Sequence, residues 1–138
     1  MQRKEISFWS KQDNVTDAVR KAVLWLKESG ADGDAAGNAE IVLAEALNNV
    51  VEHAFEYRED GRIVLELDCA KEDYAFVIKD NGKVFPGIPQ KKEMKGDAVA
   101  FEDLPEGGFG WFLIHELTNQ IFYSRVENLN VLELRIGR

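Results

Sequence analysis

The sequence predicts an α+β fold, a two-layer sandwich with a mixed or antiparallel sheet and helices on one face. Two pairs of strand-like segments, 62–68 with 74–79 and 121–125 with 131–136, are each joined by a short polar connection, which is typical of antiparallel hairpins. The helical segments are apolar on one side only, so each needs a sheet face to cover. With 138 residues, the chain can form one hydrophobic core, and we expect a single domain over residues 1–138.

The first half of the chain predicts one strand followed by two helices. Residues 6–9 alternate as a short strand, and Ser10 or Asp13 is expected to cap the helix that follows. Gly30 to Gly37 is rich in Gly, Asp and Ala and predicts a loop, after which residues 38–55 form the second helix. The first helix carries apolar residues at helical spacing, namely Val15, Val19, Ala22, Val23 and Leu26.

The second half predicts two hairpins separated by a long irregular segment and a third helix. A turn at Asp60-Gly61 precedes the first hairpin, and a turn at Glu127-Asn128 lies within the second. Residues 80–108 contain all three prolines of the chain, a stretch too long for a plain connector, and long ordered loops are usually functional. Residues 110–117 return to helix, so the order is β-α-α-β-β-loop-α-β-β.

Composition limits the kinds of partner. A formal net charge of -8 argues against direct binding to nucleic acid or to anionic membranes. No apolar stretch approaches the roughly 20 residues of a membrane span, and the first residues lack a signal-peptide core, so we expect a cytoplasmic protein without a membrane partner. The single cysteine, Cys69, excludes an internal disulfide, and its apolar surroundings favour a packing role.

The second helix has a polar face opposite an apolar one. Two adjacent asparagines inside a helix cost stability, which suggests a functional use, although an ordinary solvated face is the alternative. The polar arc holds Glu45, Asn48, Asn49, Glu52 and His53, and the opposite arc holds Leu43, Ala46, Leu47, Val50 and Ala54.

Two glycine-containing turns are further candidates for chemistry. Asp80-Asn81-Gly82 places a carboxylate at the end of an apolar strand, although this is also a common turn sequence. Gly107 to Gly110 precedes a helix, where free backbone N–H groups and the positive end of the helix dipole suit a phosphate; a simple helix entry is the alternative.

The order and spacing of these three tracts resemble the Bergerat-fold ATPases, the superfamily that includes gyrase, histidine kinases and mismatch-repair ATPases. Residues 45–49 match the N box, residues 80–82 the first glycine box and residues 108–110 the second. The short chain, His53 four residues after Asn49, and the Gly-Phe-Gly-Trp-Phe-Leu-Ile tract resemble the anti-sigma factor serine/threonine kinases most. The similarity extends from about residue 6 to residue 136.

The resemblance implies ATP and Mg²⁺ as cofactors and gives roles to individual residues. Asn49 would be the Mg²⁺ ligand and Glu45 the catalytic base that accepts the proton of the attacking hydroxyl. Asp80 would bind the adenine amino group, and Gly82 would let the backbone pass close to the base. The second glycine box, Gly108, Phe109 and Gly110, would wrap the phosphates.

Two further nucleotide-binding candidates have a second interpretation. Lys95, with Lys91 and Lys92, forms a basic cluster that could reach phosphates, or is a solvated charged loop. His53 could lie near the nucleotide, or make a hydrogen bond on the helix surface.

The resemblance also implies what such a protein does. It would sequester a sigma factor, phosphorylate a serine or threonine on an anti-anti-sigma antagonist of the STAS class, and act as a homodimer. One departure matters, because Val84 stands where the family has its second glycine, and a β-branched residue resists a positive φ. The alternative is therefore a catalytically inactive, nucleotide-gated module that acts by docking. A catalytic subunit acting on a separate histidine is a third possibility.

Other enzyme classes are not supported by the sequence. The tract from His115 to Leu117 follows the second glycine box, whereas the phosphoacceptor of a histidine kinase precedes the ATP domain. Asn119 stands where a zinc protease would need its second histidine. No P-loop and no eukaryotic-type kinase motif is present.

Overall fold

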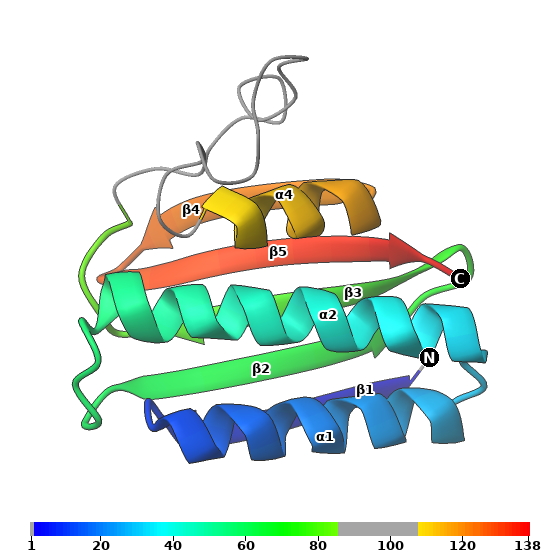
Figure 1. Cartoon of the computed structure of the whole chain (residues 1–138), viewed down its shortest axis with the longest axis horizontal. Helices are drawn as coiled ribbons and strands as arrows, with labels where there is room; N and C mark the ends of the chain where they lie inside the picture. Colours follow the sequence, from blue (N-terminus) through cyan, green and yellow to red (C-terminus); the bar gives the residue numbers. More distant parts are fainter. Residues whose placement is uncertain (1, 86–107) are drawn as a thin grey trace.

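The structure is a computed structural model, and it describes residues 2–85 and 108–138, with side chains from residue 110 onward in the second range. It contains a five-stranded sheet and helices on one side of it, so the predicted α+β class is confirmed (Figure 1). The order of elements along the chain is as expected. In sequence they are β1 (Gln2–Trp9), α1 (Gln12–Glu28), α2 (Gly33–Asn49), η1 (Val50–Ala54), β2 (Arg62–Cys69), β3 (Asp73–Asp80), α4 (Gly108–Leu117), β4 (Gln120–Val126) and β5 (Leu129–Gly137).

The sheet has the strand order β1-β2-β3-β5-β4, and every neighbouring pair in it is antiparallel. The two expected hairpins, β2 with β3 and β4 with β5, are present, and β3 pairs with β5 across them. That central pairing sets Asp80, the last residue of β3, opposite Asn130 near the start of β5. The register therefore fixes what lies beside the Asp80 side chain.

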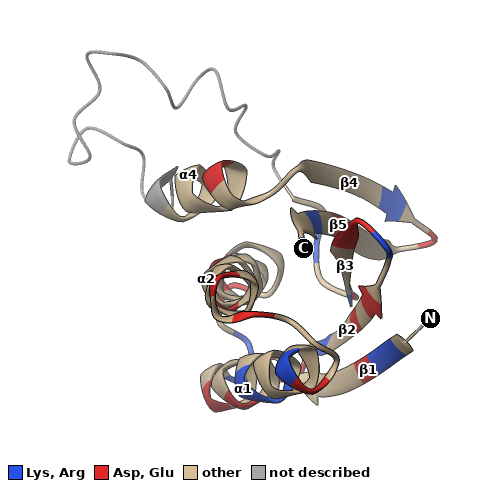
Figure 2. Cartoon of the chain, turned by 90° about the vertical axis from the view of Figure 1, so that its right-hand side faces the viewer, with Lys and Arg blue, Asp and Glu red and all other residues tan. Residues whose placement is uncertain are grey.

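The core lies between the sheet and its helices. Along β2 the side chains alternate, so that Ile63, Leu65 and Leu67 are buried while the residues between them are partly exposed. Helix α2 covers the middle of the sheet and α1 packs beside it, as the end-on view in Figure 2 shows. Small residues such as Ala39 and Ala46 on α2 are fully buried, which lets the helix lie close to the strands.

Helix α2 begins earlier than predicted. The expected loop over residues 30–37 is wrong, because the helix starts at Gly33 and Asp32 caps it by accepting a hydrogen bond from the Ala35 N–H at 2.8 Å. An aspartate cap followed by alanines outweighs the cost of two glycines in the first turns.

The predicted cap of α1 is also wrong. Lys11 occupies the N-cap position without a side-chain hydrogen bond. The buried hydroxyl of Ser10 instead donates to the Arg58 carbonyl and accepts from the Gly61 N–H, so it ties β1 to the turn before β2.

The second helix changes its geometry at Asn49. The sequence predicts one continuous helix to about residue 55, whereas residues 50–54 form a π-helix, in which Val50, Val51 and Ala54 are buried. The wider π turn is a geometry often found at functional sites. Two residues with positive φ, Glu56 (52°) and Tyr57 (66°), follow directly and end the helical segment.

Candidate functional site

The polar residues of α2 meet the start of α4. A Cβ atom placed on Gly110 would lie 2.6 Å from Glu45 Oε2 and 3.8 Å from Asn49 Nδ2. Both side chains therefore face the glycine turn, one helical turn apart on α2, as the spacing predicts. A side chain at position 110 would require the Glu45 carboxylate to move.

Asn49 is not on a solvated face. Its side chain is only 5% exposed, and its Nδ2 atom has no hydrogen-bond partner within the described residues. An unpaired amide in a buried position costs free energy and calls for an explanation, such as a ligand. The carboxamide also carries an oxygen, the donor type that Mg²⁺ prefers.

Asp80 is a buried carboxylate with one oxygen bonded and the other free. Its Oδ1 atom accepts hydrogen bonds from the Gly82 N–H at 2.9 Å and from Asn130 Nδ2 at 2.8 Å. Its Oδ2 atom is buried and has no partner within the described residues. Burial raises the pKa of Asp80, while the two hydrogen bonds and the nearby Arg125 guanidinium act in the opposite direction. The free oxygen is a buried acceptor, which a hydrogen-bond donor such as an amino group would satisfy.

Asn130 is a site residue that the sequence reasoning missed. It is fully buried on β5, and its amide bonds both Asp80 and the Lys83 carbonyl. In the sequence it follows the Glu127-Asn128 turn and looks like part of that turn. The signal that identifies it is the register between β3 and β5, which the sequence alone does not contain.

Close packing of the turn after β3 explains why position 82 is a glycine. A Cβ atom on it would lie 2.5 Å from the Ala54 carbonyl oxygen, and the Lys83 N–H donates to the same oxygen at 2.9 Å. The turn after β3 thus packs directly on the backbone of η1. The role of Gly82 beside the base stays a prediction.

Val84 does not carry the strain that its sequence position suggests. Its φ is negative and its side chain is 55% exposed, so the backbone here does not require a glycine. His53 is partly exposed, and its Nε2 atom lies 3.8 Å from Glu52 Oε2, which is too long for a hydrogen bond. Both interpretations of His53 stay predictions.

Some predicted residues lie outside what the structure describes. These are Lys95 with Lys91 and Lys92, the three prolines, and the side chain of Phe109. Gly108 is the first residue of α4.

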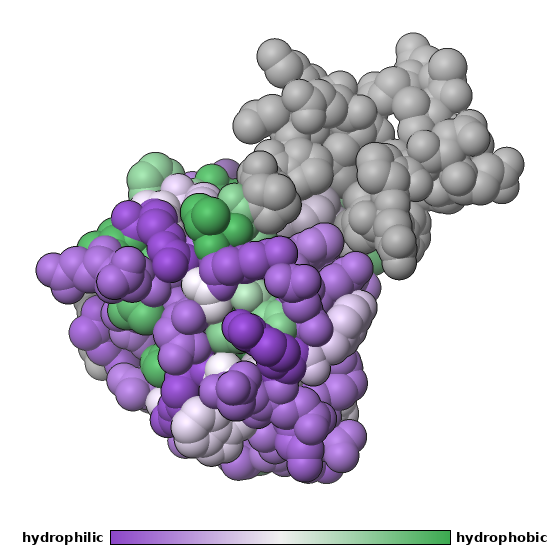
Figure 3. Space-filling model, turned by 90° about the vertical axis from the view of Figure 1, so that its left-hand side faces the viewer, coloured by the Kyte–Doolittle hydropathy of each residue, from purple (hydrophilic) through white to green (hydrophobic). Residues whose placement is uncertain are grey.

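These groups gather at one end of the molecule. The end of α2, the end of β3 and the start of α4 lie at the left of Figure 1, and Figure 3 views that end directly as a mostly hydrophilic surface. The described residues hold four buried polar or charged side chains, and three of them, Asn49, Asp80 and Asn130, are at this site. The fourth, Ser10, is satisfied within the fold. The unpaired Asp80 Oδ2 atom would accept a hydrogen bond from a ligand amino group, and the unpaired Asn49 Nδ2 atom would donate one to a ligand oxygen. The carboxamide oxygen of Asn49, and not its unpaired nitrogen, is the atom of the type that Mg²⁺ prefers.

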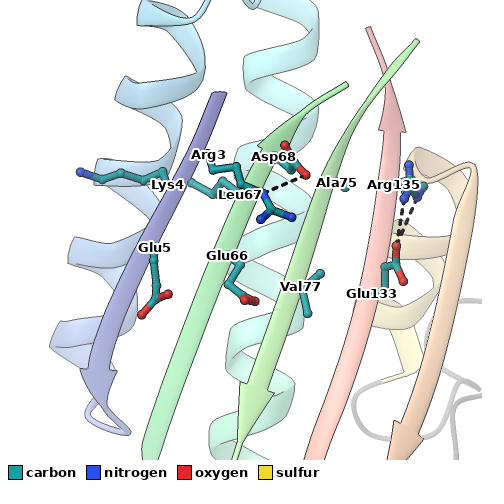
Figure 4. A pocket seen from close by; sticks show the side chains of 10 residues that line it. All are labelled: Arg3, Lys4, Glu5, Glu66, Leu67, Asp68, Ala75, Val77, Glu133 and Arg135. Carbon is teal, nitrogen blue, oxygen red and sulfur yellow. Dashed lines mark hydrogen bonds and ion pairs between the residues drawn. The ribbon is translucent and has the colours of Figure 1, made fainter. Parts of the chain in front are cut away.

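A hollow lies on the open face of the sheet, and two ion pairs line it. Arg3 contacts Asp68 at 3.4 Å, and Arg135 contacts Glu133 at 3.1 Å (Figure 4). It lies on the other side of the sheet from the helices that carry Asn49 and Gly110.

Comparison with known proteins identifies the family of the chain. The family model of the histidine kinase-like ATPase domain matches residues 8–136, and the chain belongs to this family. The serine-protein kinase RsbW of Listeria innocua is 31% identical over 107 residues, which cover 75% of this chain and 68% of that protein. The anti-sigma F factor of Clostridium botulinum is 27% identical over 106 residues, covering 77% and 73%. The predicted place among the anti-sigma serine kinases is thereby confirmed.

Solved structures agree on the fold. The catalytic domain of the histidine kinase ThkA superposes with a TM-score of 0.53 at 15% identity, covering 99% of this chain and 97% of that one. Within the described residues, no helix has both the length and the apolar composition needed to cross a membrane. The same residues contain no cluster of three or more His, Cys, Asp or Glu that could hold a metal ion.

Proposed function

We propose that this protein binds Mg-ATP at the end of α2 and transfers the terminal phosphoryl group to a serine or threonine of an anti-anti-sigma protein of the STAS class. In the same switch it sequesters a sigma factor, as a homodimer in the cytoplasm. The observation that carries the proposal is that the side chains of Glu45 and Asn49 lie beside Gly110. A carboxylate and a buried carboxamide are thereby placed next to the first turn of a helix.

Each residue has one task in this proposal. Asp80 accepts a hydrogen bond from the adenine amino group through its free Oδ2 atom. Asn49 offers its carboxamide oxygen to the cation, and the start of α4 donates backbone N–H groups to phosphate oxygens. Bound Mg-ATP would supply the phosphoryl group and the cation that neutralises its charge.

Glu45 is proposed to act as the general base. It lies one helical turn before Asn49, so its carboxylate is next to the proposed cation ligand and accepts the proton of the incoming hydroxyl. The carboxylate lies beside Gly110, in the first turn of α4, where the phosphates are proposed to bind.

The partners are inferred from the relatives. RsbW is a serine-protein kinase and the Clostridium protein is an anti-sigma F factor, which supports a protein serine as acceptor and a sigma factor as partner. A sigma factor partner would place the protein in the cytoplasm. The net charge of -8 further supports protein partners over nucleic acid.

The alternative is a module that binds nucleotide and docks without catalysis. Its main support was Val84, and the negative φ at that residue removes the strain argument. The retained Glu45 also favours a kinase, because a docking module has no need of a base.

The test is phosphoryl transfer from γ-labelled ATP to the STAS protein encoded in the same genome. We expect an acid-stable phosphoserine or phosphothreonine product, and a loss of at least about a hundredfold in rate for Glu45→Ala, the usual contribution of a general base. Glu40→Ala is the matched control, because Glu40 is an exposed glutamate on the same helix.

Three results would count against the proposal. An unchanged rate for Glu45→Ala would remove the base assignment. ATP binding without any transfer to the STAS protein would favour the docking module, and an acid-labile product would point to a phosphohistidine.

A further inference from the structure

We propose that Asn130 is a positioning residue that sets the preference of the site for adenine. It would do so by holding the Asp80 carboxylate in one orientation, and the inference therefore rests on the proposed nucleotide site. Asn130 lies outside the three motifs that carry the family resemblance, and it comes from the last strand of the sheet.

The Asn130 amide uses all of its hydrogen-bonding capacity. Its Nδ2 atom donates to Asp80 Oδ1 and to the Lys83 carbonyl, each at 2.8 Å. Its Oδ1 atom accepts from the Tyr123 hydroxyl and from Arg125 Nη1, the latter at 3.0 Å. A carboxamide has two donor hydrogens and two acceptor lone pairs, so these four bonds permit a single orientation of the group.

The fixed amide in turn fixes the carboxylate. Asp80 Oδ1 receives two N–H donors, from Asn130 and from the Gly82 backbone, and Oδ2 is left buried and without a partner among residues 2–85 and 108–138. The free oxygen is an acceptor only. An acceptor matches the amino group of adenine and opposes the carbonyl that guanine carries at the same edge.

The register between β3 and β5 places Asn130 beside Asp80. Asp80 and Asn130 are direct partners across β3 and β5, so their side chains project to the same side of the sheet. Both are at most 2% exposed, which makes the hydrogen bond between them stronger than it would be in water.

The same network reaches the backbone that follows β3. Arg125 donates to the Gly82 carbonyl at 2.8 Å, and the Tyr123 hydroxyl accepts from the Phe85 N–H at 3.1 Å. Asn130 joins these bonds to Asp80. A purely structural role would be to support residues 82–85 alone, and the test must separate that role from recognition of the base.

The experiment measures dissociation constants of the full chain for Mg-ATP, Mg-GTP and Mg-tripolyphosphate. Tripolyphosphate has no base, so it reports the phosphate end alone. For Asn130→Ala we expect ATP affinity to fall about tenfold, the usual cost of losing a hydrogen bond to a charged group, with tripolyphosphate unchanged and the ATP-to-GTP ratio reduced. In an Asp80→Ala background, the same substitution should change ATP affinity less than about twofold, because the residue acts through Asp80.

Two variants keep the test decisive. Asn130→Leu keeps the branched shape of the side chain and offers no donor to Asp80, so it should reduce the ATP-to-GTP affinity ratio even if the cavity left by Asn130→Ala prevents folding. Ser10→Ala removes a buried hydroxyl bonded to Arg58 and Gly61, and it should lower stability without changing that ratio.

An unchanged ATP-to-GTP ratio in both Asn130 variants would overturn the inference. An equal loss for all three ligands would also overturn it, as would a full effect in the Asp80→Ala background. A wild-type protein that binds none of the three ligands would overturn the proposed function itself, and this inference with it.

Discussion

Among single residues, Asp80 shows best how burial shapes this site. Its carboxylate is almost inaccessible to solvent, and one of its oxygens lacks a partner in the described structure. Because loss of hydration disfavours the charged form, burial raises the pKa of Asp80 despite the hydrogen bonds from Asn130 and Gly82 and the charge of Arg125. In the unliganded protein, the buried Asp80 Oδ2 atom lacks a hydrogen bond among the described residues, which costs free energy. The amino group of a bound ligand would supply that hydrogen bond.

The raised pKa of Asp80 predicts a pH dependence of stability and of binding. A carboxyl whose folded pKa is raised stabilises the fold fully below its unfolded pKa, and this stabilisation is lost as the pH rises through the folded value. Asp80→Asn should therefore increase the stability of the unliganded protein at neutral pH relative to wild type, with the advantage vanishing below about pH 4. Chemical denaturation at a series of pH values measures the difference.

Binding should follow the opposite trend. The ionised carboxylate is the better acceptor for an adenine amino group, so the wild-type affinity for Mg-ATP should fall as the pH drops through the raised pKa. Asp80→Asn should weaken ATP binding at pH values above the raised pKa, where the wild-type carboxyl is ionised, and the difference should shrink below it. A variant that gains no stability at neutral pH and binds ATP like wild type would contradict this account of Asp80.

On the scale of elements, η1 packs directly against the turn after β3. Gly82 packs on the carbonyl of Ala54, and the neighbouring Lys83 N–H bonds the same oxygen. The π-helix therefore presents a backbone oxygen to the turn that begins at Asp80. This contact joins η1, which continues α2 after Asn49, to the turn that follows Asp80 at the end of β3.

Two glycine substitutions should have opposite effects on stability. Gly82→Ala would place a Cβ atom 2.5 Å from a backbone oxygen, and overpacking of this kind should cost about 2 kcal/mol. Gly37→Ala, in the interior of α2, meets no atom within 4 Å, and it should stabilise the protein by about 1 kcal/mol because alanine favours the helix.

The measurement is chemical denaturation of both variants without nucleotide. Gly37→Ala is the matched control, since it makes the same chemical change at an open position. Equal stability of Gly82→Ala and wild type would show that the turn does not pack on η1 as described.

On the scale of the whole molecule, the antiparallel sheet brings together segments that are far apart in sequence. Residues of α2, β3, α4 and β5 all contribute polar groups to one end of the fold (Figure 1). The opposite face of the sheet carries paired charges (Figure 4). Ligand binding at the site should therefore stabilise the entire fold.

Thermal unfolding should report that stabilisation. At about 100 times its dissociation constant, a ligand that binds only the folded state adds about 2.7 kcal/mol to the free energy of unfolding. We expect such an increase with Mg-ATP, a comparable one with Mg-ADP, and a much smaller one with Mg-GTP at the same concentrations.

Omitting Mg²⁺ is the control for Asn49, and it should reduce the shift with ATP. Equal stabilisation by GTP and ATP would argue against the role of Asp80. No shift with any nucleotide would argue against the site as a whole.

Local patterns were sufficient for much of this protein. Alternation and hairpin turns predicted the strands, and the spacing of Glu45 and Asn49 on one helix predicted that they share a face. Local signals also misled in places. The glycines at 33 and 37 suggested a loop, although the Asp32 cap begins the helix there. Ser10 looked like a helix cap, but its hydroxyl bonds the turn that precedes β2.

The sequence by itself determined the fold class, the three motif tracts and the family, because these depend on residue type and spacing along the chain. Only the tertiary structure decided that Asn130 faces Asp80, that Gly82 packs on Ala54, and that Val84 needs no positive φ. The reason is that strand register and close packing relate residues that are distant in sequence, and no local pattern records which of them will meet.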